Sequence, residues 1–263
     1  MIALTIAGSD SGGGAGIQAD LKTMSALGVY GASVITAITA QNTRGVTAVH
    51  GIPADIVTAQ LDAVLSDLDV KAIKIGMVGD RAVISAIARA LAGSRIPIVL
   101  DPVMIATSGD RLIGEGAEKA LFSELLPLAT LVTPNVPEAG VLLNAKSAVD
   151  VPQMREQARE LAALGPAILL KGGHLTTGDA TDVFFHEGRP ELLSAARIAS
   201  PNTHGTGCTL SSAVTAFLAR GMALRAAVHA AKEYISAAIA ASDQLQIGSG
   251  HGPVHHFHAV WPR

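Results

Sequence analysis

The residues of this 263-residue chain that could do chemistry lie in short segments rich in glycine. The clearest is residues 202–209, NTHGTGCT, which precede an apolar helical pattern. Small residues at a helix start let several backbone N–H groups point at one anion, and the helix dipole favours negative charge there. Such a segment could stabilise the charge that develops on a transferred phosphoryl group.

Cys208 lies at that positive helix end and is the one cysteine of the chain. A helix N-terminus lowers the pKa of a thiol, so Cys208 could accept a proton from a substrate hydroxyl. The alternative is a buried structural cysteine, the commoner fate of a lone cysteine. Position alone leaves both interpretations open. The single thiol does exclude an intramolecular disulfide and a cysteine-based zinc site within one chain.

A second glycine-rich segment, residues 8–16, has the sequence GSDSGGGAG. It lacks the lysine of a P-loop, and Ala19 stands where G-x-G-x-x-G needs its last glycine. The segment is either a flexible strand-to-helix turn or a ligand-facing loop. Four glycines in the five positions 12–16 exceed what a turn needs and favour the ligand-facing loop.

Two carboxylates and a histidine-rich tail are further candidates. Asp101 and Glu138 follow apolar segments, and hard oxygen ligands of this kind suit Mg²⁺ held through water. Glu138 also follows a proline in a helix first turn, where a capping role is favoured. The histidines of residues 255–258 could bind a metal, but an exposed or interfacial tail is the favoured interpretation.

Short β-branched runs alternate with helical patterns and define the elements that must position these residues. Nearly continuous apolar character predicts strands at residues 2–7, 32–39, 72–75, 97–100, 131–133 and 167–170. A hairpin is predicted from residues 181–186 and 191–198, joined through residues 188–190. The alternation predicts an α/β fold with a mostly parallel, doubly wound sheet, and no linker divides the chain, so one domain is expected over residues 1–263.

Almost every predicted strand ends in a polar or glycine-rich group, and open α/β sheets bind ligands at that edge. The intervening helices are expected to begin after the N-caps Asp80 and Asp150. Their periodicity places Ile56 and Leu164 on buried faces.

Composition limits the function classes. Hydrophobic residues make up 49% of the chain and charged residues 16%, so a sizeable core is expected. A net charge of −3 gives no basic excess and argues against a nucleic-acid partner. No apolar run is long enough for a membrane span. A lone thiol and an N-terminus unlike a signal peptide favour the cytoplasm.

Taken together, the motifs resemble those of a known family. They are GSDSGGGAGIQADLKT, SVITAITAQNT, KIGMVGD, LDPVM, TPNVPEA, KGGH and NTHGTGCTLSSA, in this order over nearly the whole chain. The sequence is similar to the hydroxymethylpyrimidine/phosphomethylpyrimidine kinases of thiamine biosynthesis, within the ribokinase-like superfamily. GTGC, where most ribokinase-like kinases have GTGD, makes the resemblance specific. It implies a ribokinase-like three-layer sandwich with helices flanking the central sheet.

The resemblance also implies an activity: ATP- and Mg²⁺-dependent phosphorylation of 4-amino-5-hydroxymethyl-2-methylpyrimidine to its monophosphate and then to the diphosphate. A homodimer is implied, with small-molecule substrates as the other partners. Thr107 stands where many relatives carry lysine, so this chain lacks the positive charge that those relatives have at this position.

Site residues are carried over position by position. Gln41 matches the pyrimidine-binding residue, and its amide both donates and accepts hydrogen bonds. The other residues that match the substrate pocket are Gly8, Asp20, Met77 and Val103. The matches to the anion hole are Gly205, Thr206 and Gly207, with Cys208 in place of the usual aspartate base. The matches at the nucleotide end are Lys171 for phosphate, Asn135 and Glu138 for hydrated Mg²⁺, and Asp101 for nearby acidity.

Three alternatives remain. A pyridoxine/pyridoxal kinase of the same superfamily is the nearest, because one side chain such as Gln41 does not settle specificity. A non-catalytic pyrimidine-binding regulator would lose the base, the metal carboxylates or the anion hole, and none is missing from the sequence. A nucleotide-linked oxidoreductase is disfavoured by the absent G-x-G-x-x-G motif.

Overall fold

The computed structural model describes residues 1–104, 114, 116–175 and 178–261. Thr107, and with it the question of a cation at that position, lies outside these ranges. Among the described residues, no helix combines the length and the apolar character that crossing a bilayer requires.

Nine strands of the described chain form one sheet in the order β3-β2-β1-β4-β5-β6-β7-β8-β9. Their bounds are β1 Ile2–Asp10, β2 Tyr30–Asn42, β3 Gly45–Gly51, β4 Val70–Ile75, β5 Ile98–Leu100, β6 Leu131–Val132, β7 Ala167–Leu170, β8 Ala180–His186 and β9 Arg189–Ala195. The pairings from β2 through β1, β4, β5 and β6 to β7 are parallel, while β3, β8 and β9 add antiparallel edges. The prediction of a mostly parallel α/β sheet is confirmed.

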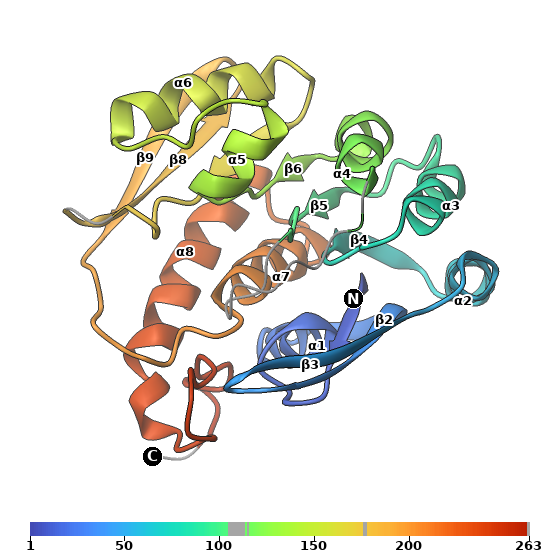
Figure 1. Ribbon diagram of the computed structural model, residues 1–263, viewed down its shortest axis with the longest axis horizontal. Coiled ribbons are helices and arrows are strands. Elements are labelled where there is room, and N and C mark those ends of the chain that lie inside the picture. The colour runs from blue at the N-terminus through green and yellow to red at the C-terminus, as the bar shows by residue number, and fades with distance from the viewer. Residues whose placement is uncertain (105–113, 115, 176–177, 262–263) are drawn as a thin grey trace.

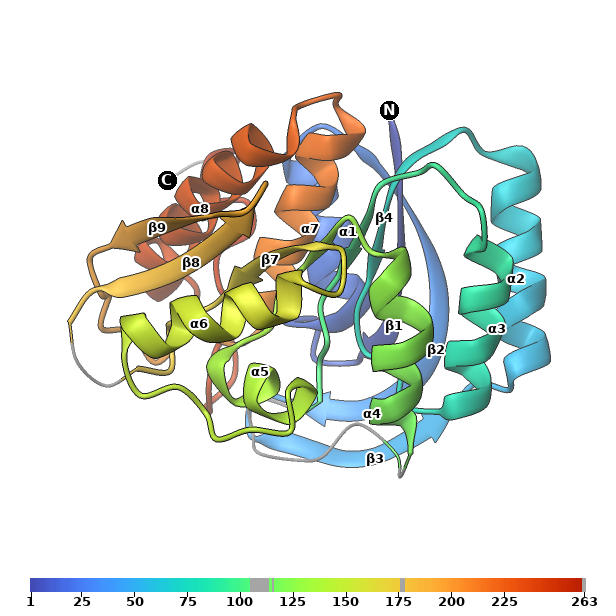
Figure 2. The same cartoon turned by 90° about the horizontal axis from the view of Figure 1, so that it is seen from above.

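Helices cover both faces of this sheet (Figures 1 and 2). The α-helices are α1 Gly16–Ala26, α2 Ala54–Asp67, α3 Arg81–Leu91, α4 Ala117–Ala120, α5 Val136–Leu142, α6 Val151–Ala162, α7 Thr206–Ala219 and α8 Leu224–Ala240. Helices α2 to α6 pack with one face of the sheet in one apolar core. Helices α1, α7 and α8 cover the other face in two smaller apolar clusters. The three layers confirm the predicted sandwich.

Local sequence explains where two of the helices begin. Asp80 Oδ1 accepts the N–H groups of Ala82 at 2.7 Å and Val83 at 3.1 Å. Asp150 Oδ1 accepts the N–H of Gln153 at 2.9 Å. Both residues are N-caps as predicted, because a carboxylate satisfies first-turn N–H groups that have no partner within the helix.

The observed strands differ from the predicted ones in three details. Strand β3 was not expected, because its residues are mostly exposed and its sequence lacks an apolar alternation. The β8–β9 turn is formed by Glu187 and Gly188, both with positive φ, so Arg189 already belongs to β9. A left-handed residue pair gives a two-residue hairpin the twist of its strands. Strand β9 also ends at Ala195 rather than at residue 198.

Two predicted core positions are exposed. Ile56 lies in the first turn of α2, one residue away from the buried Val57, and is half exposed. A single residue step turns a side chain by about 100° around a helix, which moves Ile56 to the rim of the apolar face. Leu164 is exposed because α6 ends at Ala162, so the helical periodicity no longer applies to it.

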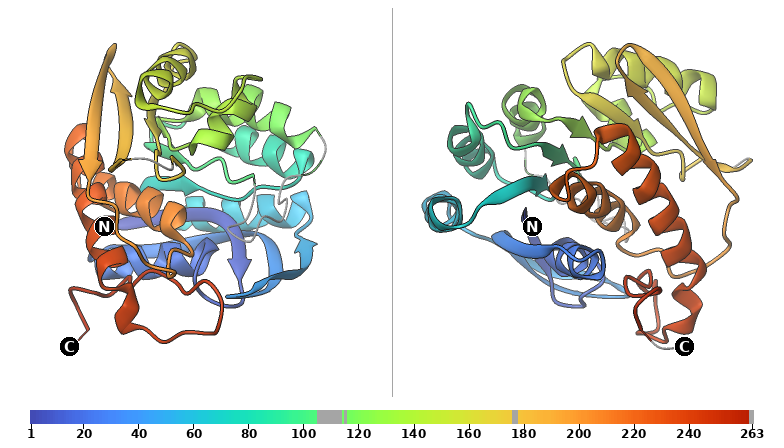
Figure 3. Two further views of the ribbon diagram at one scale, coloured as in Figure 1. Left: turned by 60° about the vertical axis from the view of Figure 1, so that its left-hand side comes forward. Right: turned by 180° about the vertical axis from the view of Figure 1, so that it is seen from behind.

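The C-terminal segment folds back against the end of α8 (Figure 3). His255 donates its N–H to Ala238 O at 3.0 Å, and Tyr234 Oη donates to His256 O. His255 and His256 are each only 5% exposed. The expectation of an exposed or interfacial tail was therefore wrong for these two residues, since backbone hydrogen bonds to α8 draw them inside.

This burial predicts acid sensitivity. Desolvation, helped by Lys22 and neighbouring histidines, lowers the pKa of His256 from 6.5 to about 3. The unfolded chain then binds a proton that the folded chain rejects, so the free energy of unfolding should fall between pH 6.5 and about pH 3. The expected slope is about 1.4 kcal/mol per pH unit for one proton. Chemical denaturation across this range should show a shallower slope for His256→Gln. The exposed His50→Gln is the matched control, and equal slopes in all three proteins would refute the assignment.

Candidate active site

A cleft of about 600 Å³ opens at the carboxyl ends of the parallel strands. This volume is within the usual range for small-molecule and cofactor sites. Its walls come from the loop after β1, the end of β2, the segments after β4, β5, β6, β7 and β9, the start of α7 and helix α8. The cleft lies at the sheet edge that the sequence predicted.

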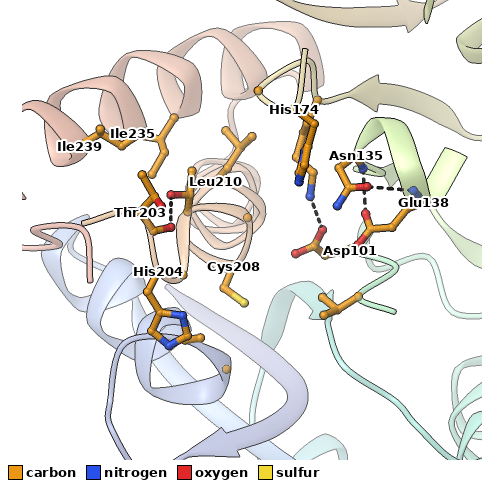
Figure 4. Close-up of a pocket in the computed structure, with 18 of the residues that line it drawn as sticks. Asp101, Asn135, Glu138, His174, Thr203, His204, Cys208, Leu210, Ile235 and Ile239 are labelled. Atoms are coloured by element: carbon orange, nitrogen blue, oxygen red, sulfur yellow. Dashed lines mark hydrogen bonds and ion pairs between the residues drawn. The ribbon is translucent and has the colours of Figure 1, made fainter. Parts of the chain in front are cut away.

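Figure 4 shows three kinds of side chain in this cleft. The polar residues Asp101, Asn135 and Glu138 lie together on one side. The apolar residues Leu210, Ile235 and Ile239 lie on the other side. Cys208 lies between the two groups, which gives the cleft a polar end and an apolar end around one thiol.

The start of α7 is shaped by glycine. Gly205 has φ +78 at the N-cap, and a Cβ placed on it would lie 1.9 Å from Gly14 O. Only glycine allows the backbone to pass this closely over the loop that follows β1. Thr206, Gly207 and Cys208 follow in the first turn and line the cleft. The structure thus brings the predicted anion hole and the predicted base to one helix end.

The Cys208 thiol does not have the lowered pKa that its position suggested. Burial raises the pKa to about 11, the charge of Lys74 opposes this rise, and Asp20 and Asp101 add to it. Desolvation of the thiolate outweighs the helix end, so Cys208 carries its proton at neutral pH. The side chain is nevertheless partly accessible, and it lines the cleft.

Gln41 lines the cleft beside Thr39 and His204. Its Oε1 accepts from Thr39 Oγ1 at 3.1 Å, and its Nε2 lies 3.4 Å from His204 Nε2. His204 Nε2 lies 3.0 Å from Asp10 Oδ2. Because His204 Nε2 donates to Asp10, it cannot also accept from Gln41, so the Thr39 hydroxyl is the group that orients the Gln41 amide at the cleft surface. Gly8, Met77 and Val103 line the same region, and a Cβ on Gly8 would collide with Met77 Cε at 2.3 Å.

Asp10 organises the glycine-rich loop. Its carboxylate accepts the N–H groups of Gly12 at 2.8 Å, Gly14 at 3.0 Å and Ala15 at 2.8 Å. Burial opposes ionisation, but these bonds and the one from His204 hold the pKa of Asp10 below its usual value. The loop is therefore ordered, and Gly8, Ser9, Asp10, Ala15 and Gly16 line the cleft, whereas its ligand-facing role stays a prediction.

Asp20 does not lie where the resemblance placed it. Its side chain is fully buried beneath the cleft, and it accepts hydrogen bonds from Thr5 Oγ1 at 2.6 Å and Ser212 Oγ at 2.6 Å. Lys74 Nζ lies 2.8 Å from Asp20 Oδ2. A direct contact with substrate is therefore wrong for Asp20, since its carboxylate is already occupied by buried donors.

At the polar end, Lys171 Nζ and Asp101 Oδ1 form an ion pair at 2.8 Å. Asp101 Oδ1 also accepts from Thr133 Oγ1 at 3.0 Å, and Oδ2 accepts from Ser211 Oγ at 3.3 Å. Burial opposes ionisation of Asp101, but Lys171 and Lys74 hold its pKa below the usual value. Both partners line the cleft, with Lys171 the more exposed of the two.

Asn135 and Glu138 form a capping box at the start of α5. Asn135 donates its N–H to Glu138 Oε2 at 2.8 Å, and Glu138 donates its N–H to Asn135 Oδ1 at 2.8 Å. The favoured capping interpretation is confirmed. Burial raises the pKa of Glu138 to about 7, with Lys171 opposing and Asp101 adding to the rise. Both side chains still line the cleft, which leaves a ligand-binding role open to them.

The sequence pattern of the family described as phosphomethylpyrimidine kinase matches residues 10–255. The chain belongs to the phosphomethylpyrimidine kinase family. A curated relative is the hydroxymethylpyrimidine/phosphomethylpyrimidine kinase of Rhizobium meliloti (strain 1021). The two sequences are 60% identical over an alignment that spans 99% of this chain and 98% of the relative.

Two solved structures are close to this family member. The ADP complex of Bacillus subtilis pyridoxal kinase is 38% identical with a TM-score of 0.90 and covers 98% of both chains. Phosphomethylpyrimidine kinase from Clostridium difficile 630 is 45% identical with a TM-score of 0.80, and it covers 91% of this chain and 99% of its own. The fold is thus common to kinases named for two different ring substrates.

The donor set at the polar end fits a hydrated Mg²⁺ ion. In this family member, Glu138 offers a carboxylate and Asn135 an amide oxygen in the cleft, and Mg²⁺ prefers such hard oxygen ligands. The described residues contain no cluster of three or more histidine, cysteine or acidic side chains that could hold a metal ion. Mg²⁺ commonly keeps its waters and binds one or two carboxylates together with substrate phosphates, which needs no such cluster.

Sequence reasoning missed three charged residues at this site. Asp10 could have been found, because an aspartate before glycines often accepts the N–H groups of its own turn. Lys74 sits in an apolar strand and gave no signal of its buried partner. Arg197 donates to the carbonyl oxygens of Gly173 at 3.0 Å and Leu175 at 2.7 Å, which fixes the segment after β7.

Proposed function

We propose that the protein transfers the γ-phosphoryl group of ATP to the hydroxymethyl group of 4-amino-5-hydroxymethyl-2-methylpyrimidine, and then phosphorylates the monophosphate to the diphosphate. The observation that carries this proposal is the joining of three groups in one cleft: the Gln41 amide, the glycine-rich start of α7 with Cys208, and the Lys171 ammonium. Membership of the phosphomethylpyrimidine kinase family supports the same activity.

Each wall of the cleft has a part in the proposed reaction. Gln41 binds the aminopyrimidine edge, because its amide both donates and accepts hydrogen bonds. The first-turn N–H groups around Gly205 and Gly207 stabilise the charge spread over the transferring phosphoryl group. Lys171 neutralises phosphate charge at the polar end. Cys208 orients the substrate hydroxyl and, as the thiolate, accepts its proton.

The apolar end of the cleft binds the purine ring of ATP, and the polar end binds its phosphates. Leu210, Ile235 and Ile239 form an apolar wall that suits a purine ring. Glu138 and Asn135 would hold hydrated Mg²⁺. The Asp101 carboxylate, which is paired with Lys171, would add negative charge nearby. Mg²⁺ bound there would neutralise charge on the ATP phosphates.

The wider organisation follows as part of the proposal. We infer one kinase domain over residues 1–263, a homodimer, and a cytoplasmic location. The continuous nine-stranded sheet supports the single domain, and the lone free cysteine suits a reducing compartment.

The decisive test is ADP release by purified protein with three separate acceptors: hydroxymethylpyrimidine, its monophosphate and pyridoxine. Turnover with both pyrimidines is expected. Turnover with pyridoxine alone would favour the second candidate, a pyridoxine/pyridoxal kinase, which the TM-score of 0.90 to the pyridoxal kinase supports. Tight pyrimidine binding without ADP release from any acceptor would indicate a regulator instead.

Gln41→Ala should raise the KM for hydroxymethylpyrimidine by about 10- to 100-fold and leave the KM for ATP nearly unchanged. A lost hydrogen bond pair at a buried ligand edge costs about 1–3 kcal/mol, and Gln41 lines the cleft beside Thr39 and His204. Initial-rate kinetics with each substrate varied in turn measures both constants. The matched control is Gln244→Ala, an exposed glutamine. Equal loss of affinity for both substrates would mean that Gln41 is structural.

A further inference from the structure

Lys74 is a buried cation to which the proposed reaction assigns no role. It lies in strand β4 with its side chain fully buried, and it is among the largest fully buried side chains of the described residues. A buried charge is costly unless it is paired and hydrogen-bonded. A hydrophobic residue would pack at this sheet position at a lower desolvation cost, so fold stability alone does not explain a lysine here.

One carboxylate holds this ammonium group in place. Lys74 Nζ donates to both oxygens of Asp20, at 3.0 Å and 2.8 Å. Thr5 Oγ1 donates to the same carboxylate from β1, and Ser212 Oγ donates from α7, each at 2.6 Å. Four elements of the fold therefore converge on a single ion pair with little freedom to move.

The ion pair lies directly beneath the reactive end of α7. Ser212 follows Cys208 by four residues, so the two side chains lie on the same face of α7, one turn apart. Lys74 and Cys208 both line the cleft. A Cβ on Gly76 would come within 2.5 Å of Lys74 Nζ, which shows how closely the backbone after β4 passes the ammonium group.

Four charged groups from the surrounding elements interact electrostatically with Cys208. Lys74 comes from β4 and Asp20 from α1, while Asp101 follows β5 and Lys171 follows β7. The Gly16 N–H adds a backbone hydrogen bond. Lys171 is already paired with Asp101 at 2.8 Å, and after burial Lys74 has the largest effect on the pKa of Cys208.

We propose that Lys74 is a positioning residue for phosphoryl transfer: once the Cys208 thiol has lost its proton to solvent water, the Lys74 ammonium group, held by Asp20, is the counter-charge for the thiolate that accepts the proton of the substrate hydroxyl. This inference rests on the proposed role of Cys208. Lys74 itself touches neither the hydroxyl nor the phosphoryl group. It acts by stabilising the thiolate, and Asp20 limits this effect by balancing part of the positive charge.

A purely structural ion pair predicts something different. If Lys74 only neutralised Asp20, losing either partner would loosen the fold without a consistent effect on the thiol. A counter-charge role predicts effects of opposite sign. Lys74→Met leaves the Asp20 carboxylate unopposed and should disfavour the thiolate, whereas Asp20→Asn leaves the ammonium group unopposed and should favour it.

The chain itself makes the experiment clean, because Cys208 is its one cysteine. The rate of alkylation by iodoacetamide, measured from pH 6 to pH 10 without substrates, reports the thiolate fraction of Cys208 alone. At pH 8, Lys74→Met should react at least about tenfold more slowly than wild type, and Asp20→Asn about tenfold faster, since tenfold corresponds to one pKa unit. Lys71→Met, an exposed lysine of the same strand, should match wild type.

Activity provides the second readout. Lys74→Met should lower kcat with little change in the KM for ATP, and Lys74→Arg should recover part of the loss because it restores a cation. Alkylation profiles unchanged in both Lys74→Met and Asp20→Asn would overturn the proposal. If Lys74→Met does not fold, the direction of the Asp20→Asn shift decides alone. Failure of the proposed function would be seen separately, as wild-type protein that alkylates as expected but releases no ADP.

Discussion

Cys208→Ala should lower kcat for both phosphorylation steps by about 10²- to 10⁴-fold, the usual contribution of a positioned general base. The variant removes the only side chain of the α7 first turn that can take a proton from the acceptor hydroxyl. ATP should bind with wild-type affinity, because the apolar wall and Lys171 are untouched. ADP release and nucleotide titration together measure the two effects.

The size of this effect depends on how the thiol ionises. Because burial raises the pKa of Cys208 to about 11, the free protein holds little thiolate at neutral pH. Activity should therefore rise with pH over the range in which the thiolate fraction grows. Cys208→Ser is the matched control, since it keeps the volume and the hydrogen-bonding atom but is a far weaker acid. Wild-type rates in Cys208→Ala would return this residue to a structural role.

The sequence predicted the centre of the fold well, because buried parallel strands carry their signal locally. Residues 167–170 coincide with β7, whose four residues are all buried. Strand β3 could not be found in the same way, since an exposed edge strand needs only a neighbour with free backbone groups and no apolar pattern. The predicted position of the β8–β9 turn was wrong because Glu187 adopts a positive φ, which is uncommon for glutamate and cannot be expected from its residue type.

In the candidate site, too, features set by neighbouring residues could be predicted from the sequence, and features set by long-range packing could not. Caps are local, so the pairing of Asn135 with Glu138 follows from their spacing of three residues. The partner of Asp20 lies 54 residues away in β4, and no spacing rule connects them. The ionisation of Cys208 was predicted in the wrong direction, because the helix end is visible in the sequence whereas the desolvation that outweighs it is produced by packing.

Gly205→Ala should be the most damaging small substitution at the site, because it strikes both stability and catalysis. A non-glycine residue at φ +78 costs about 1–3 kcal/mol in strain. The added Cβ would also lie 1.9 Å from Gly14 O, a backbone atom that moves only if the loop after β1 moves with it. That shift would carry the first-turn N–H groups out of position, and loss of one such donor typically lowers kcat by about 10²- to 10³-fold.

Gly221→Ala is the matched control at the other end of the same helix. Gly221 has φ +85, but a Cβ there would meet no atom within 4 Å. Both variants therefore share the backbone strain, and only Gly205→Ala adds the collision with the glycine-rich loop. Denaturant unfolding should show a larger loss of stability for Gly205→Ala, and ADP release should fall in that variant alone. Equal stability losses with full activity in both would mean that the close approach of Gly205 to Gly14 neither shapes the anion hole nor constrains the loop.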